Sequence, residues 1–348
     1  MPVAPITDIK SLHLDELRGI AEPSYRADQI TNWLYEKRVN SFAEMTDLPQ
    51  TLRTKLADNF SFGKVDTLRV LGSKDTTQKF LFRLSDGNLI ESVLIPASPA
   101  LYGSPSDRRT ICISTQVGCA YGCKFCASGL DGWKRNLRPD EIVNQIMAVE
   151  DATGERIDNI VFMGMGEPLL NYKNVLKAID RITAPDGLAM SPRRITVSTA
   201  GVAKQIRQLG DDNVKFKLAL SLHAPNDAKR NEIMPINESN NLKALTEALN
   251  YFYKQTKNEI TFEYILFNNF NDSQKDADEL IRIYRQVPAD LVNIIEYNPI
   301  DFASYTKPSE ERITEFISYL GKHKVNARLR RSRGKDIDAA CGQLANKS

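Results

Sequence analysis

The sequence has few of the features that mark exported or membrane-bound proteins. No apolar run approaches the roughly 20 residues that a membrane-spanning helix needs, and residues 1–10 lack the apolar segment of a signal peptide. We therefore expect a cytoplasmic protein with no membrane partner. Charge of one sign is not in excess either, because 46 Lys and Arg residues against 44 Asp and Glu residues give a net charge of +2. This balance neither requires nor excludes a nucleic-acid partner, so only local clusters of charge can argue for one.

Cysteine is scarce, and its placement argues against structural disulfides. The 348 residues contain five cysteines, and three of them, Cys119, Cys123 and Cys126, fall within eight residues. An odd number of cysteines in a chain without an export signal favours metal or redox chemistry over a disulfide framework. Apolar residues make up 42% of the chain and charged residues 26%, which is typical of a globular protein with a substantial core.

The hydrophobic pattern changes near residue 63. Before it, apolar residues at helical spacing predict helices, and after it alternating residues predict strands with a hairpin turn. We therefore expect a small helical domain over residues 1–62 and a β-extension over 63–104. The expected segments are helices starting after Ser24 and at Pro49, strands at 67–71, 79–84 and 89–95, a turn at 85–88 and a loop at 97–107.

From residue 110 onward, predicted strands and helices alternate with short loops. Six β/α units of this kind build a parallel sheet that is either doubly wound or curled into a partial barrel. In both arrangements the ligand site lies at the carboxyl ends of the strands. We expect this core over residues 105–334 and a C-terminal segment over 335–348. The strands are expected at 111–114, 157–163, 194–198, 214–221, 260–266 and 292–297, with amphipathic helices at 139–152 and 242–253 among those between them.

The three clustered cysteines form a C-x3-C-x2-C motif just after the first strand of the β/α series. Three thiolates on a short loop can bind three irons of a [4Fe-4S] cluster, which leaves the fourth iron without a protein ligand. The alternatives are a zinc site completed by His223 or another cysteine, and three buried free thiols. Zinc sites usually combine two C-x2-C knuckles, and the sequence lacks a second one. An iron–sulfur cluster is therefore favoured.

Polar residues stand at the expected carboxyl ends of four further strands. A lone Ser, His or Asn is more often a helix cap than a ligand, but four such positions at one edge favour a shared binding site. Together with the cysteine loop, this pattern resembles the radical S-adenosylmethionine (SAM) superfamily. The resemblance implies an α/β fold with a partial (β/α)6 barrel, and a cluster whose open iron is chelated by SAM. The implied SAM-binding residues are Gly166 and Glu167, which resemble the superfamily's GGE loop, with Ser198, Ser221, Leu222, His223 and Asn298.

Four longer motifs narrow the resemblance. They read TQVGC at 115–119, MGMGEP at 163–168, SLHA at 221–224 and DIDAACGQL at 336–344. Together they resemble the RlmN/Cfr family of RNA adenine methyltransferases over nearly the whole chain, including the helical N-terminus. Residues 267–272 depart from the Gly-Val-Asn-Asp type of turn associated with the family, although an Asn-Asp pair is kept.

The family resemblance implies a mechanism with two molecules of SAM per turnover. The first methylates Cys341, and the second provides a 5′-deoxyadenosyl radical that removes a hydrogen atom from the new S-methyl group. The methylene radical then adds to adenine, which links protein and RNA covalently. Glu91 is implied as the proton acceptor and Cys112 as the resolving thiol, which forms a transient disulfide with Cys341. From the residues alone, an isolated strand cysteine is usually inert and a strand glutamate is usually ion-paired or solvent-facing.

The residue after Glu167 bears on which carbon is methylated. Pro168 is similar to the RlmN branch, which implies methylation of adenine C2 in the peptidyl-transferase region of 23S rRNA and of adenine 37 in tRNAs. The alternative is the Cfr branch, which typically has alanine there, methylates C8 and confers antibiotic resistance. A third hypothesis, of another class, is a non-catalytic, metal-stabilised RNA-binding protein. The resemblance further implies a monomer that receives electrons from a flavodoxin-type protein.

Local basic clusters offset the small net charge. Their placement near strand ends predicts a phosphate-binding rim around the active site. A target adenine must leave its stack to react, so Tyr121 and Trp133 are candidate stacking partners. The N-terminal helical part resembles the family's accessory RNA-binding domain, and a stabilising cap is the alternative. The basic residues are Lys134, Arg135, Arg193, Arg194, Lys229, Arg230, Arg328, Arg330, Arg331, Arg333 and Lys335.

Overall fold

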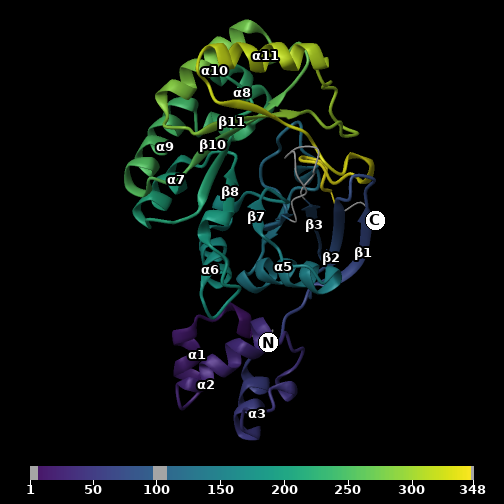
Figure 1. Ribbon diagram of the computed structural model, residues 1–348, viewed down its shortest axis with the longest axis vertical. Coiled ribbons are helices and arrows are strands. Elements are labelled where there is room, and N and C mark those ends of the chain that lie inside the picture. The colour runs from purple at the N-terminus through teal and green to yellow at the C-terminus, as the bar shows by residue number, and fades with distance from the viewer. Residues whose placement is uncertain (1–6, 97–107, 346–348) are drawn as a thin grey trace.

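The computed structural model describes residues 7–96 and 108–345. It shows an N-terminal lobe of short helices (residues 9–59), a β-extension and an α/β core in sequence order (Figure 1). The predicted loop at 97–107 lies outside the described residues. Among those that are described, no helix is long and apolar enough to cross a membrane.

The N-terminal lobe buries apolar residues at helical spacing. Ile30 and Leu34 are buried one turn apart, and Leu52 and Leu56 repeat this pattern in the last helix of the lobe. The helix predicted after Ser24 begins at Tyr25, but the Ser24 side chain makes no capping hydrogen bond. The elements are η1 (Ile9–Ser11), α1 (Leu14–Ile20), α2 (Tyr25–Thr31), η2 (Asn32–Glu36), η3 (Phe42–Glu44) and α3 (Gln50–Asn59).

Within the described residues, one sheet of ten strands runs through the β-extension and the core. Strands β1 to β4 pair antiparallel, and every pair from β4 onward is parallel. The sheet order is β1 (Asp66–Gly72), β2 (Gln78–Arg83), β3 (Leu89–Pro96), β4 (Arg109–Cys112), β7 (Asn159–Phe162), β8 (Ile195–Thr199), β9 (Lys217–Ser221), β10 (Ile260–Leu266), β11 (Leu291–Glu296) and β12 (Ala327–Arg330).

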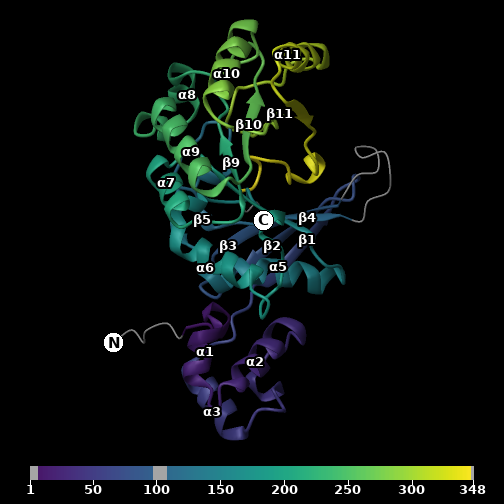
Figure 2. The ribbon, with the colours of Figure 1, turned by 60° about the vertical axis from the view of Figure 1, so that its left-hand side comes forward.

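All six predicted core strands are present, and β12 adds a further parallel strand. Helices lie along the outside of the parallel part of the sheet (Figures 1 and 2). Every residue of β10 and β11 is buried between this helical layer and the interior. The helices are α5 (Pro139–Thr153), α6 (Tyr172–Thr183), α7 (Ala203–Asp211), α8 (Asp227–Ile233), α9 (Leu242–Thr256), α10 (Gln274–Gln286) and α11 (Glu310–Lys322).

The parallel strands curl around a central cavity of about 450 Å³, which we call the barrel cavity. Side chains from β4 at one end of the parallel strands and from β12 at the other, such as Cys112 and Arg330, line this same space. A flat sheet could not bring its two ends to one cavity, so the core is a partial barrel. The predicted α/β class, with a partial barrel, a helical N-terminus and a β-extension, is therefore confirmed.

Candidate active site

The cysteine motif lies on a loop that leaves a small second sheet, β5 (Gln116–Gly118) with β6 (Trp133–Asn136). Cys119 donates its backbone N–H to the Gly132 carbonyl at 3.2 Å, which closes the loop. Gly118 has φ +72°, and a Cβ there would lie 1.9 Å from the same carbonyl oxygen, so the closure requires glycine. Burial raises the pKa of the Cys119 thiol to about 12, and it also raises those of Cys123 and Cys126.

The structure bears on the zinc alternative for the cysteine loop. Within the described residues, no three His, Cys, Asp or Glu side chains converge on one point, as a single metal ion requires. Since each thiolate of a [4Fe-4S] site binds a different iron, a cluster does not need such convergence. His223 does not complete a zinc site, because its Nδ1 accepts the Ile265 N–H at 3.1 Å and burial lowers its pKa to about 3. The neutral ring therefore carries its proton on Nε2.

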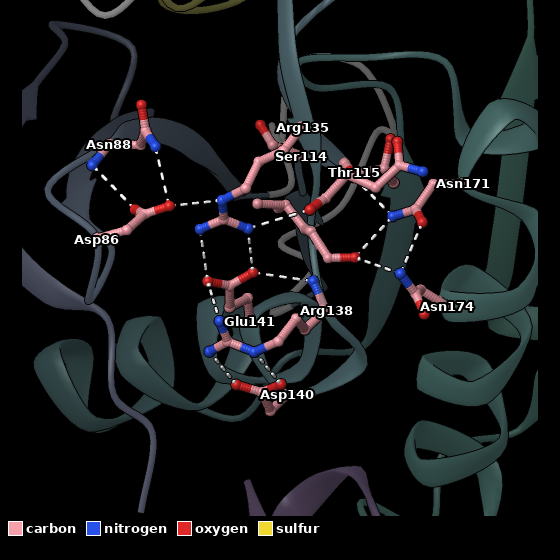
Figure 3. Close-up of polar contacts among 12 residues, drawn as sticks. Asp86, Asn88, Ser114, Thr115, Arg135, Arg138, Asp140, Glu141, Asn171 and Asn174 are labelled. Atoms are coloured by element: carbon pink, nitrogen blue, oxygen red, sulfur yellow. Dashed lines mark hydrogen bonds and ion pairs between the residues drawn. The ribbon is translucent and has the colours of Figure 1, made fainter. Parts of the chain in front are cut away.

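Ion pairs of the half-buried Arg135 fix the base of the cysteine loop (Figure 3). Arg135 on β6 donates to Glu141 at the start of α5 through two bonds of 2.8 Å, and its Nε donates to Asp86 on the β2–β3 turn at 2.6 Å. Asn171 donates to the Thr115 carbonyl at 2.8 Å, beside β5. Together these contacts join the β-extension, the cysteine loop and the first core helix.

The run after β7 places a carboxylate at the carboxyl end of the sheet. Glu167 accepts the backbone N–H of Leu169 at 3.0 Å and that of Ala200, after β8, at 2.7 Å. Its side chain is buried, which raises its pKa to about 6. Gly166 has φ +96°, and a Cβ there would lie 2.5 Å from Cβ of Gln116. The loop can therefore turn back under β5 only with glycine at this position.

The next two strand ends meet beside Glu167. The hydroxyls of Ser198 on β8 and Ser221 on β9 lie 3.3 Å apart. Leu222 is fully buried directly after them. His223 follows at φ +54°, and its ring packs edge-on against Phe125 of the cysteine loop with a centroid distance of 4.8 Å. The predicted SAM-binding residues on β7, β8 and β9 are thus gathered next to the cysteines.

Asn298, in the loop after β11, has one oxygen that the protein leaves unpaired. Its Nδ2 donates to the Cys341 carbonyl at 3.2 Å. Its Oδ1 is buried and has no hydrogen-bond partner among the described residues. A buried acceptor without a donor is costly unless a ligand supplies one, and the amino groups of SAM are suitable donors. This atom and the gathered strand ends fit SAM.

Cys112 and Cys341 face the same barrel cavity, which Cys126 of the cysteine loop also lines. Cys112 ends β4, whereas Cys341 lies on a chain segment that crosses the cavity mouth. All five cysteines have free thiols in the structure. Burial raises the pKa of Cys112 to about 12, while the charge of Arg330 acts in the opposite direction.

Glu91 lies inside the β-extension rather than at a strand end. It is 1% exposed, and its Oε1 lies 3.0 Å from Nζ of Lys79, which is also buried. Its Oε2 accepts the backbone N–H of Ala345 at 2.9 Å. The carboxylate therefore touches the chain segment that carries Cys341.

Comparisons with known proteins agree with this geometry. The radical SAM superfamily profile matches residues 113–281, and that of the ribosomal RNA large subunit methyltransferase N-terminal domain matches residues 8–61. A probable dual-specificity RNA methyltransferase RlmN of Cytophaga hutchinsonii is 49% identical, over 97% of this chain and 93% of that protein. The dual-specificity RNA methyltransferase RlmN of Campylobacter curvus is 43% identical, over 96% and 92%. The chain belongs to the RlmN family.

A solved structure supports the assignment to the RlmN family. The crystal structure of a radical SAM methyltransferase from Sphaerobacter thermophilus superposes with a TM-score of 0.89 at 39% identity, covering 98% of this chain and 100% of that one. Membership of a radical SAM family implies a [4Fe-4S] cluster and SAM.

The turn that departs from the expected RlmN-family pattern still braces the site. Asn271 is fully buried and donates to the carbonyls of His223 and Ile265, at 2.8 Å each. Its own Oδ1 accepts the Phe267 N–H at 2.8 Å. The retained asparagine therefore fixes His223 despite the changed turn sequence.

The predicted phosphate-binding rim is only partly correct. Arg135 is committed to ion pairs, and Arg230 is fully buried behind the site, where it donates to the Leu222 carbonyl at 3.1 Å. Lys229 pairs with Asp276. The cationic groups of these three side chains already bind acceptors within the protein, so we assign them a structural role. The basic residues that do line the barrel cavity are Arg193, Arg194, Arg328, Arg330, Arg331 and Arg333.

Sequence reasoning did not predict that Lys79 and Arg230 of this RlmN-family chain are buried. Lys79 gave no signal, since a lysine in a strand is usually exposed, and Arg230 was assigned to the rim. Neither Tyr121 nor Trp133 is among the described residues that line the barrel cavity, and their role as stacking partners stays a prediction.

Proposed function

We propose that the protein is a radical SAM methyltransferase that adds a methyl group to C2 of an adenine in 23S rRNA and of adenine 37 in tRNAs. One observation carries the proposal: Cys112 and Cys341, 229 residues apart in sequence, face one cavity beside the cysteine loop. Two thiols that face one cavity near the SAM site suit a reaction in which one thiol carries the methyl group and the other releases the methylated RNA. A binding protein has no need of this arrangement.

Cys119, Cys123 and Cys126 would hold the cluster, and Glu167, Ser198, Ser221 and Asn298 with their neighbours would hold SAM. When bound, the cluster and SAM supply a methyl group and the one-electron chemistry that removes a hydrogen atom from it. Adenine C2 is electron-poor and not nucleophilic, so it cannot take the methyl group by direct displacement.

Cys341 serves as the methyl carrier and becomes joined to the ring carbon through its S–CH2 group. Glu91 accepts the proton that leaves this carbon. Cys112 then attacks the Cys341 sulfur as its thiolate, which forms a disulfide and breaks the S–C bond. The electron pair of that bond stays with the CH2 carbon on the RNA, which takes up a proton to become the methyl group. Since Cys112 is buried with a raised thiol pKa, the positive charge of Arg330 in the same cavity assists formation of its thiolate.

The substrate assignment is supported by the relatives and by Pro168. Cytophaga and Campylobacter relatives are named for dual-specificity RNA methylation. Pro168 matches the C2 branch of the family. The arginines along the cavity suit RNA phosphates, and the N-terminal lobe suits an accessory RNA-binding domain (residues 1–62). A cytoplasmic monomer supplied with electrons by a flavodoxin-type protein completes the proposal.

An isotope experiment tests the proposal. The anaerobically reconstituted protein is given reductant, SAM with a trideuterated methyl group, and either a peptidyl-transferase rRNA fragment or tRNA, and nucleosides are measured by mass spectrometry over several turnovers. We expect 2-methyladenosine that carries two deuteriums, because one is lost to the radical. An 8-methyl product would reject the C2 assignment, and three deuteriums would reject the S–CH2 route. No product from a preparation with an intact cluster would favour the binding protein.

A further inference from the structure

The proposed base Glu91 has a buried cation as its partner. Glu91 on β3 and Lys79 on β2 are diagonal neighbours on one face of the antiparallel pair, since Glu91 is opposite Leu81 and Lys79 is opposite Val93. Lys79 is 4% exposed and Glu91 is 1% exposed, and their charged atoms are 3.0 Å apart. Burying two charges is costly unless their geometry is well satisfied, and this pair also lies beside the proposed chemistry.

The same pair holds both sides of the chain segment that carries Cys341. Lys79 donates to the Asp338 carbonyl at 3.2 Å, three residues before Cys341. Glu91 accepts the Ala345 N–H at 2.9 Å, four residues after it. Between these points, the Gly342 carbonyl accepts the Ala127 N–H of the cysteine loop at 2.7 Å. The ion pair therefore spans the loop that presents Cys341.

We propose that Lys79 is a positioning residue that holds the Glu91 carboxylate and the Cys341 loop in one fixed arrangement. The inference rests on the proposed function. In the covalent adduct, the ring C–H proton passes to a Glu91 oxygen and its electron pair remains in the ring. A buried carboxylate favours its protonated form unless a cation stabilises the charge. The Lys79 ammonium lies 3.0 Å from the Glu91 carboxylate and fixes its position, while its bond to the Asp338 carbonyl fixes the position of the Cys341 loop.

A second anchor of the same segment provides a matched control. Asp75, on the β1–β2 turn, accepts the Arg333 Nε–H at 3.0 Å and the Gly334 N–H at 2.9 Å. Backbone N–H groups and hydroxyls around it hold its pKa near 2, so it is ionised throughout the neutral range. Asp75 lies on the turn, whereas Lys79 and Glu91 lie within β2 and β3. Asp75→Ala therefore loosens the segment without touching the proposed base.

The test measures three successive stages of the reaction. Wild type, Lys79→Met, Lys79→Gln, Lys79→Arg, Glu91→Gln and Asp75→Ala are reconstituted anaerobically, and their melting temperature and iron content are checked. Methylation of Cys341 is measured by peptide mass, the covalent protein–RNA adduct by denaturing electrophoresis, and methylated adenosine by mass spectrometry.

We expect Lys79→Met and Lys79→Gln to methylate Cys341 normally but to accumulate the adduct, with product formation falling at least about tenfold. Lys79→Arg keeps the charge, and we expect its rate of product formation to lie within about threefold of the wild-type rate. Asp75→Ala should lower adduct and product together, without accumulation. If Lys79→Met does not fold, Lys79→Gln decides, because its amide can still donate to both partners but carries no charge.

The Lys79 variants test the role of Lys79, and Glu91→Gln separately tests the proposed base. If Glu91→Gln accumulates adduct while the folded Lys79 variants behave like wild type, or like Asp75→Ala, the role of Lys79 is rejected and that of Glu91 stands. If Glu91→Gln turns over like wild type, the base assignment itself is wrong.

Discussion

At the scale of single residues, the most informative titration is that of Glu167. Its buried carboxyl has a pKa of about 6, and the ionised form is the one suited to the SAM amino group. We expect SAM affinity of the reconstituted protein to weaken about fourfold between pH 8 and pH 5.5, following the ionised fraction. Glu167→Gln should bind SAM weakly, with an affinity that does not change between pH 8 and pH 5.5. Equilibrium dialysis with labelled SAM measures both, and parallel pH profiles for the two proteins would contradict the assignment.

Protonation of Glu167 does not unfold the protein, so it cannot lower SAM affinity in acid by that route. The carboxyl pKa is raised in the folded protein, so the folded state binds a proton more tightly than the unfolded chain does. This group therefore stabilises the fold as pH falls through about 6 and loses that contribution as pH rises. The titration of Glu167 therefore does not destabilise the fold in acid, and the melting temperature at each pH checks the contribution of other groups.

Single residues also show where sequence reasoning stops. Three thiols at close spacing are rare and chemically specific, so the sequence predicts a metal-binding role for Cys119, Cys123 and Cys126, and this role stays a prediction. Arg230 could not be distinguished from a surface cation, since burial depends on which strands converge around it. Lys79 was missed for the same reason, because its partner Glu91 belongs to a different strand.

At the scale of elements, the turn after β7 depends on Gly166. Its φ of +96° disfavours any side chain, and a Cβ would also lie 2.5 Å from Cβ of Gln116. Gly87, with φ +83°, has no described atom within 4 Å of such a Cβ and is a matched control. We expect Gly87→Ala to cost about 1 kcal/mol of unfolding free energy, and Gly166→Ala about 3 kcal/mol with loss of SAM binding. Equal costs in urea unfolding would show that the contact with Gln116 is unimportant.

The elements that the sequence predicted well are those with strong apolar runs. Strands β10 and β11 are buried along their whole length, so their runs of apolar residues were easily recognised. Strand β12 alternates arginines that face the cavity with smaller residues, and its sequence looked like a charge cluster. The pair β5 and β6 is short and polar, and it forms only because the cysteine loop brings its strands together.

At the scale of the whole molecule, the N-terminal lobe lies at one end of the core (Figure 2), and a buried cation joins the two. Lys10 is 5% exposed. Its Nζ donates to Asn144 on α5 at 2.8 Å and to the Gly63 carbonyl at 3.0 Å, in the link between lobe and β-extension. Burial lowers the pKa of Lys10, so these two acceptors must compensate for the loss of hydration.

Replacing Lys10 should therefore loosen the lobe without unfolding the core. Lys10→Met leaves both acceptors with fewer donors, and we expect it to cost about 2 kcal/mol at the junction. Native-state trypsin cleavage after exposed Lys64, in the same link, should then accelerate about thirtyfold, since local opening becomes more frequent. Lys37→Met, which removes an exposed cation from the same lobe, is the control and should leave cleavage unchanged. Cleavage of Lys10→Met at the wild-type rate would mean that the other contacts between lobe and core, such as the ion pairs of Arg38 with Glu150 and Asp151, hold the lobe without Lys10.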